Sequence, residues 1–226
     1  MKKIGLIAAM AKELAPLLAV CENTEECAEF GDKKVIKATV SGKELYIIES
    51  GVGEIYAAAA TQFLITALNV EAIINFGVCG SLSARRTIKS TVFVKGVVHY
   101  EMDTTAIDDI KVGQYTDYPT EVIPVNEELL NKAVAAFPET ECVLCASGNK
   151  FIADSEEKQK LFNLFGTEVC EMESAGILLT CNLNKIPCVM VKAVSDAEGG
   201  AGDFVKNVHE AATVYISLVM KLAAEL

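Results

Sequence analysis

The run Val189-Met190-Val191-Lys192-Ala193-Val194 is mostly apolar and β-branched, and it ends on Ser195-Asp196. Such a run predicts a buried strand that delivers a hydroxyl and a carboxylate at its C-terminal end. Earlier in the chain, Val169 opens a shorter strand-like run that leads into Glu171-Met172-Glu173. Ligands of α/β sheets bind in the crevice beyond the C-terminal ends of the strands. Carboxylates at two such ends therefore predict acid–base chemistry on a small polar molecule.

Outward from these two runs, strand-like and helical patterns alternate along the whole chain. We expect strands over residues 3–9, 33–40, 43–49, 71–76, 91–100 and 141–146, and helices over 11–20, 54–68, 127–137, 155–165, 173–183 and 205–225. This alternation predicts an α/β fold with one central sheet. The hairpin around Ser41-Gly42 makes that sheet mixed rather than purely parallel. We expect residues 1–226 to form a single domain, because no linker or internal repeat interrupts the pattern.

Composition narrows the classes of function. The chain has 226 residues, 51% of them hydrophobic, and a net charge of −11. That charge argues against a nucleic-acid backbone as partner, and no apolar run approaches the ~18 residues of a membrane span. The eight cysteines lie mostly in apolar contexts, which indicates buried free thiols in a reducing cytoplasm. Cys142 and Cys145 have CxxC spacing but no second pair and no nearby histidine, so we expect no metal site.

Two glycine-containing segments, Gly51-Val52-Gly53 and Gly77-Val78-Cys79-Gly80, each follow an apolar strand. Glycines there let the backbone approach a ligand closely, although a plain turn explains each segment alone. Neither is a GxGxxG or Walker sequence, so a dinucleotide or nucleoside triphosphate is not expected.

Acidic residues recur at the ends of the expected strands. Glu13 follows the first strand, as Glu171, Glu173 and Asp196 follow later ones. Each alone is an ordinary helix-terminal charge, but together they indicate one shared site. Phe151 stands in a loop beyond a strand, where it serves either as a stacking platform for a base or as simple packing.

These segments together resemble the bacterial methylthioadenosine/S-adenosylhomocysteine nucleosidases of the nucleoside phosphorylase superfamily. The matching blocks occur in family order: Ile4 to Glu13, Glu49 to Gly53, Asn75 to Gly80, Ser147 to Ile152, Glu171 to Glu173 and Val194 to Asp196. The resemblance implies a three-layer α/β/α fold with a central mixed sheet, usually as a homodimer. It also implies hydrolysis of the N-glycosidic bond of 5′-thio derivatives of adenosine, with no cofactor.

The resemblance also implies roles for individual residues. Glu13 would activate the attacking water, and Asp196 would protonate purine N7. One acid must then be ionised while the other holds a proton. The residues implied to bind substrate or to orient these two are Met10, Val52, Val78, Cys79, Gly80, Phe151, Ile152, Glu171, Met172, Glu173, Ser195 and Phe204.

The aperiodic segment 101–125 is long for a loop in a compact domain, which predicts a functional or interface role. With the Ala-rich helix over 54–68, we expect it to form the homodimer interface. Thr104 and Ile107 would reach the 5′ group in the partner's pocket, as the resemblance implies.

Two departures from the family pattern concern the glycine loop and the last strand. Val78-Cys79 stands where the family usually has a small hydroxyl residue and a second glycine, and Lys192 stands where arginine is typical.

A purine nucleoside phosphorylase stays open as an alternative function. Phosphate sites favour arginine, and only Arg85 and Arg86 form an adjacent pair here. An inactive nucleoside-binding protein is disfavoured by the presence of Glu13, Glu173 and Asp196. The preferred 5′ substituent stays undetermined.

Overall fold

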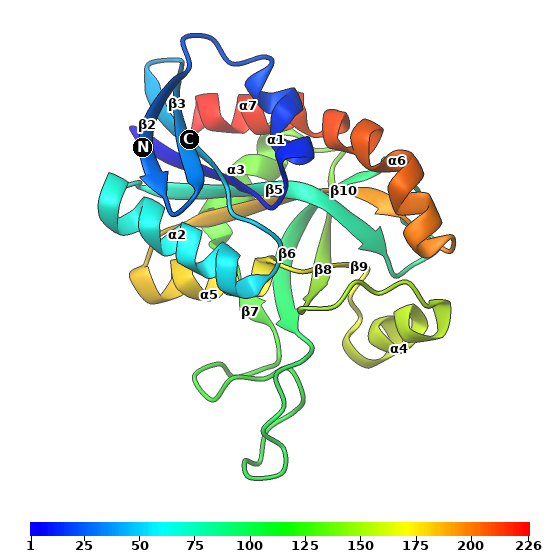
Figure 1. Ribbon diagram of the computed structural model, residues 1–226. Coiled ribbons are helices and arrows are strands. Elements are labelled where there is room, and N and C mark those ends of the chain that lie inside the picture. The colour runs from blue at the N-terminus through cyan, green and yellow to red at the C-terminus, as the bar shows by residue number, and fades with distance from the viewer.

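The computed structural model describes residues 1–226 as a ten-stranded mixed sheet with helices packed on both sides (Figure 1). The strands are β1 (Lys3–Ala8), β2 (Glu25–Phe30), β3 (Lys33–Val40), β4 (Lys43–Glu49), β5 (Ala72–Ser81), β6 (Thr91–His99), β7 (Ile123–Pro124), β8 (Glu141–Ser147), β9 (Val169–Glu171) and β10 (Cys188–Asp196). The helices are α1 (Ala11–Leu18), α2 (Glu54–Leu68), α3 (Glu127–Ala136), α4 (Ser155–Phe165), α5 (Ser174–Asn184), α6 (Gly200–Val214) and α7 (Ile216–Glu225). The α/β class and the mixed sheet are confirmed.

Strand β5 is the centre of the sheet, and all ten of its residues are buried. It pairs in parallel with β1 on one side and with β10 on the other. Beyond β1, the sheet continues through β4, β3 and β2 to an open edge. In the other direction the pairings run from β10 to β6, β8 and β9 and then return to β5. These five strands therefore close into a ring.

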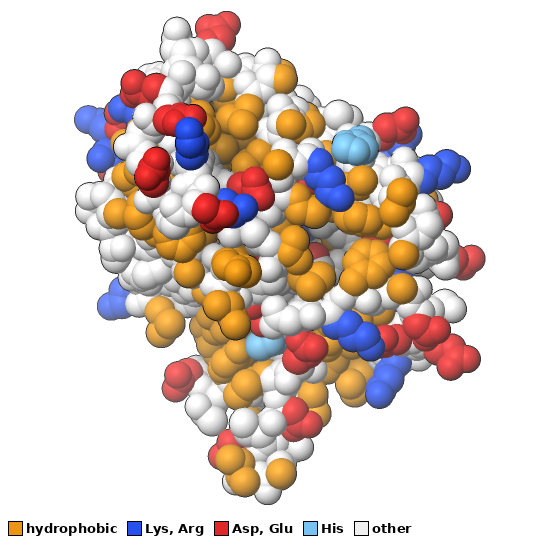
Figure 2. Space-filling model, in the orientation of Figure 1, with side chains coloured by type: hydrophobic (Ala, Val, Ile, Leu, Met, Phe, Trp, Pro, Cys, Tyr) orange, Lys and Arg blue, Asp and Glu red, His pale blue; other side chains and the backbone are white.

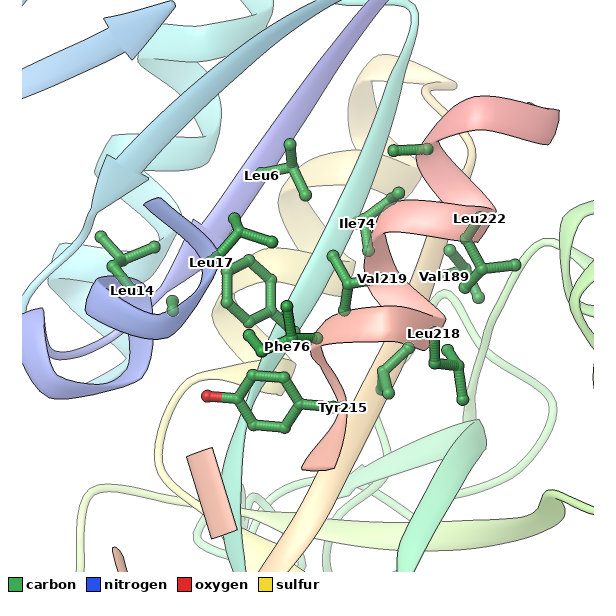
Figure 3. Close-up of a cluster of buried hydrophobic side chains, with 14 of the residues drawn as sticks. Leu6, Leu14, Leu17, Ile74, Phe76, Val189, Tyr215, Leu218, Val219 and Leu222 are labelled. Carbon is green, nitrogen blue, oxygen red and sulfur yellow. The ribbon is translucent and has the colours of Figure 1, made fainter. Parts of the chain in front are cut away.

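Two hydrophobic cores fill the space between the sheet and its helices. One lies beneath α1, α6 and α7, and Figure 3 shows its centre, where Phe76 of β5 faces Tyr215 between α6 and α7. Their ring centroids are 5.4 Å apart in an edge-on arrangement. The other core lies beneath α2 and α5. The Tyr215 hydroxyl also donates to the Glu13 backbone carbonyl at 3.2 Å, which fixes the first turn of α1.

Four expectations about the elements differ from the structure. Strand β7 is two residues long and lies in the segment 101–125, where no strand was expected. Strand β2 was not expected, because it is acidic and mostly exposed and so has no apolar run. The predicted helix over 205–225 begins earlier, at Gly200, and is divided at Tyr215 into α6 and α7. The predicted strand over 71–76 continues to Ser81, so the glycine-containing segment is extended strand rather than a turn. None of the helices has the length and apolar composition that crossing a membrane requires.

Candidate active site

A cavity of about 280 Å³ opens where β1, β5, β9 and β10 reach their C-terminal ends. Figure 2 shows hydrophobic side chains around a hollow on this face of the molecule. Most residues expected at the site line this cavity, namely Met10, Glu13, Val52, Val78, Cys79, Gly80, Phe151, Glu171, Met172, Glu173, Ser195, Asp196 and Phe204. Ala9 and Cys170 also line it and were not expected.

Three expected residues lie outside this cavity. Ile152 lines a small adjoining space of about 30 Å³ that also touches Phe151 and Asp196. Thr104 and Ile107 lie on the loop between β6 and β7, which projects from the body of the chain (Figure 1). Ile107 is 84% exposed. Within one chain, the loop therefore contributes nothing to the walls of the cavity.

Glu13 is held by backbone groups of two elements. It is the third residue of α1, and its Oε2 accepts the Met10 N–H at 2.9 Å. Its Oε1 accepts the Val78 N–H of β5 at 2.8 Å. A Cβ at Gly77 would lie 2.7 Å from Oε1, so this approach requires glycine there. Burial raises the pKa of Glu13, against the opposing effects of the Val78 N–H and the Lys192 charge.

Glu171 and Lys192 form a buried ion pair beneath the cavity. Lys192 Nζ lies 2.9 Å from Glu171 Oε2, and the two side chains are only 2% and 3% exposed. Glu171 also accepts the Ser174 backbone N–H at 3.0 Å. Burial alone would raise the pKa of Glu171, but the Lys192 ammonium and the hydrogen bonds from Ser174 together outweigh it and hold that pKa below its ordinary value. The charge of Glu171 is therefore fixed in place by the lysine that departs from the family pattern.

Glu173 lies next to this pair and has a different environment. Its Oε1 accepts the Gly53 N–H at 2.8 Å, which brings the loop before α2 to the site. Burial and then the neighbouring Glu171 charge raise the pKa of Glu173 to about 7. Two carboxylates separated by one residue thus differ in their readiness to take a proton, because one is paired with a cation and the other is not.

Asp196 is 2% exposed and is bound on both carboxyl oxygens. Ser195 Oγ lies 3.0 Å from Oδ1 and 3.2 Å from the Cys79 carbonyl, so its single proton serves one of the two. Lys158 Nζ of α4 donates to Oδ2 at 2.9 Å. Sequence reasoning missed this lysine, because it occupies a helix whose other charges are mostly solvated and lies far from Asp196 in the chain.

The aromatic residues of the cavity form one wall. The Phe151 and Phe204 rings meet edge-on with centroids 5.5 Å apart. Lys12 Nζ lies 4.4 Å from the centroid of Phe204. Phe151 is 40% exposed, so its neighbours cover the ring only in part. Packing and stacking are therefore compatible at this position.

No group of three or more His, Cys, Asp or Glu side chains has the geometry to hold a metal ion. All eight cysteines are free. The cavity lining contains no arginine and no lysine. Arg86 is engaged elsewhere by Glu141 and Glu168, and Arg85 by Glu168. The charges that face the cavity are thus carboxylates.

Comparisons with known proteins agree with this geometry. The family model of the phosphorylase superfamily matches residues 3–226. A 5′-methylthioadenosine/S-adenosylhomocysteine nucleosidase of Shewanella oneidensis is 33% identical over 199 residues, covering 86% of this chain and 84% of that protein. The crystal structure of the enzyme of that name from Neisseria meningitidis, in complex with methylthio-immucillin-A, is 27% identical, with a TM-score of 0.93 and full coverage of both chains.

The native structure of a futalosine hydrolase of Helicobacter pylori is 25% identical with a TM-score of 0.93, covering 100% of this chain and 98% of that one. The likeness to solved structures thus extends over the entire fold, and the likeness to the Shewanella protein over most of the sequence. The chain belongs to the phosphorylase superfamily and, within it, to the 5′-methylthioadenosine/S-adenosylhomocysteine nucleosidases.

Proposed function

We propose that this protein hydrolyses the N-glycosidic bond of 5′-methylthioadenosine, S-adenosylhomocysteine or a related adenosine nucleoside, releasing adenine and the free ribose or thioribose. The observation that carries the proposal is that Glu13, Glu173 and Asp196 line one cavity, each in a different electrostatic setting. Residues 1–226 act as one catalytic domain, since these three residues come from the beginning and the end of the chain.

Cleavage of a ribose–purine bond passes through a state with positive charge on the sugar. Glu13 accepts a proton from the attacking water. Its raised pKa makes it a stronger base than an exposed glutamate, while the two backbone N–H groups fix its direction. Glu173 accepts hydrogen bonds from the ribose hydroxyls through Oε2, which has no partner in the protein, and its charge favours the developing cation.

Adenine leaves as a neutral base only if its N7 receives a proton. Asp196 delivers that proton, and Ser195 orients the carboxyl group. Phe151 stacks on the purine, with Phe204 supporting its edge. The Ile152 backbone reads the adenine edge, and Met172 lies under the sugar. Met10, Val52, Val78, Cys79 and Gly80 complete the walls of the cavity, and Glu171 holds the charge that tunes Glu173.

The composition of the cavity supports water over phosphate as the nucleophile. A phosphate dianion needs cationic or N–H donors close to it, and neither arginine nor lysine lines the cavity. Two buried lysines near the cavity are paired, Lys192 with Glu171 and Lys158 with Asp196. Lys12 lies outside the lining, against the Phe204 ring.

A homodimer completes the proposal. Large apolar side chains are exposed close to the cavity mouth and on the projecting loop: Val52, Ile55, Tyr56 and Ile107. Side chains of this size favour burial against a partner. The partner's Thr104 and Ile107 would then wall the 5′ end of the pocket. Eight free cysteines support a cytoplasmic setting, where the activity would serve methionine salvage and purine nucleoside metabolism.

The test is product analysis with purified enzyme. Methylthioadenosine, S-adenosylhomocysteine, 5′-deoxyadenosine and adenosine are each incubated with and without phosphate. We expect adenine and a reducing sugar at rates that phosphate does not change, with the ranking of the four nucleosides giving the 5′ preference. Dependence on phosphate with formation of ribose 1-phosphate would establish a phosphorylase instead.

A further inference from the structure

Hydrolysis of a nucleoside, the function proposed above on which the following inference rests, requires protons to enter and to leave the site. In each turnover Asp196 loses a proton to N7, and Glu13 gains one from water. One proton must therefore enter on the Asp196 side and one must leave on the Glu13 side. Asp196 is 2% exposed and lines the nucleoside cavity, so a bound nucleoside separates it from bulk water during the reaction.

Lys158 is the one side chain outside the nucleoside cavity that hydrogen-bonds to Asp196. It is 5% exposed, and its Nζ donates to Asp196 Oδ2 at 2.9 Å and to the Ala197 carbonyl at 2.6 Å. Ser195, the other partner of the carboxyl group, lines the nucleoside cavity itself. The mechanism assigned to the site leaves Lys158 without a role.

A second cleft lies behind Lys158. It has a volume of about 650 Å³ and is formed by the segment after β5, the first turns of α4 and the region between β10 and α6. Lys158, Ser155, Gln159 and Asp203 are among its polar walls. No residue lines both this cleft and the nucleoside cavity. The Lys158–Asp196 pair is therefore a direct bridge between a polar, water-accessible space and the buried acid.

We propose that Lys158 is the proton inlet of Asp196. The Lys158 ammonium transfers a proton from Nζ to Oδ2, and the Asp196 carboxyl transfers a proton to N7. The electron pair of the broken C–N bond stays on adenine. Lys158 is then a neutral amine, and it takes a proton from water or a buffer acid in the cleft. Glu13, which is also 2% exposed, releases its proton to water that enters the cavity after the products leave, so charge and protons balance over the cycle.

The role explains how an aspartate paired with a cation can still act as an acid. An ammonium beside a carboxylate normally stabilises the charged form of that carboxylate. Here the ammonium is itself the source of the proton, so the pair delivers one proton to N7 without Asp196 having to stay protonated at rest.

Chemical rescue tests the relay. Lys158→Ala is expected to lower kcat about 10²-fold, within the range for loss of a general acid, and to leave KM almost unchanged. Methylammonium and ethylammonium should restore kcat, and more acidic amines of similar size should restore more. Lys160→Ala, an exposed lysine on the same helix, is the matched control and should behave as wild type.

Three results would overturn the relay: wild-type kcat in Lys158→Ala, equal rescue by tetramethylammonium (which carries charge but no proton), or rescue independent of amine acidity. If Lys158→Ala does not fold, Lys158→Met fills the same space. It should fold and lose a similar factor of kcat without rescue, and wild-type kcat in this variant also overturns the relay. Wild-type enzyme without any nucleosidase activity would instead refute the proposed function, so the two failures are distinguishable.

Discussion

Lys192→Met removes one half of the buried pair beneath the cavity. In the wild type, Lys192 Nζ and Glu171 Oε2 are 2.9 Å apart, and both side chains are almost fully buried. At an effective dielectric constant of about 20, two charges at that distance attract by about 6 kcal/mol. The cost of taking both charges out of water offsets most of that attraction. The variant, however, leaves the Glu171 charge buried without its cation.

The expected loss in the free energy of unfolding is about 3–5 kcal/mol, the usual cost of leaving a buried charge unpaired. For a chain of this size that corresponds to a fall in Tm of about 10 °C. The loss should depend on pH. Lys192 holds the pKa of Glu171 below its ordinary value in the folded protein, so the wild-type pair keeps its full contribution at pH 5 and at pH 8 and loses it only at lower pH. In the variant, Glu171 is buried without its cation, which raises its pKa, so Glu171 takes up a proton as pH falls and the cost of the unpaired charge decreases. The difference between wild type and variant should therefore be smaller at pH 5 than at pH 8.

Urea unfolding at the two pH values measures this loss. Lys132→Met is the matched control, because Lys132 and Glu128 are also 2.9 Å apart but are 53% and 79% exposed. It should cost less than about 1 kcal/mol. Lys192→Arg keeps the charge and should lose less than Lys192→Met. In a Glu171→Gln background, Lys192→Met should cost little or nothing. An equal loss in both backgrounds would refute the account of the pair.

Four further predictions concern catalysis and assembly. Asp196→Asn should bind ligand normally but lose about 10²–10⁴-fold in kcat, and near-normal turnover would remove Asp196 from the mechanism. Glu13→Gln should suppress hydrolysis while calorimetry still detects adenine binding; if activity persists, another base acts. KM should rise as pH falls below about 7, because Glu173 then gains a proton and no longer accepts from the ribose hydroxyls; a KM that stays flat between pH 6 and 8 contradicts this role. Light scattering should show a dimer at micromolar concentration, with specific activity falling on dilution and in Ile107→Asp; a monomer of full activity argues against the shared pocket.

Much of the fold could be predicted because its strands are buried. The first half of β5 is a mostly apolar run and was predicted as a strand, whereas its continuation to Ser81 was not, because Gly77 and Gly80 favour a turn in the sequence. Strand β2 could not be recognised in the same way, since it lies at an edge and its residues are mostly exposed. The division at Tyr215 also leaves little trace, because both halves keep a helical period and only the burial of the ring marks the position.

The acids of the candidate site could be predicted from the sequence, because they follow strands whose C-terminal ends converge. The lysines that pair with these acids could not be predicted. Lys158 is 38 residues from Asp196 in the chain, and nothing in a helical pattern distinguishes a buried lysine from a solvated one. Lys192 could be noticed as a departure, but its partner Glu171 depends on how the ring of strands closes. Long-range pairing of this kind is set by the topology rather than by local pattern.

The ring of strands limits edge-to-edge pairing between the sheets of two copies of the protein. It is formed by β5, β10, β6, β8 and β9. Strands within a ring have neighbours on both sides and present no free backbone to another molecule. The long open edge of the sheet is β2, which carries Glu25, Glu26 and Glu29 and is interrupted by a bulge between Glu26 and Ala28. Acidic side chains and bulges on an edge oppose the docking of a further strand. Protection against fibrous aggregation therefore rests on one short charged strand at the side of the sheet away from the ring.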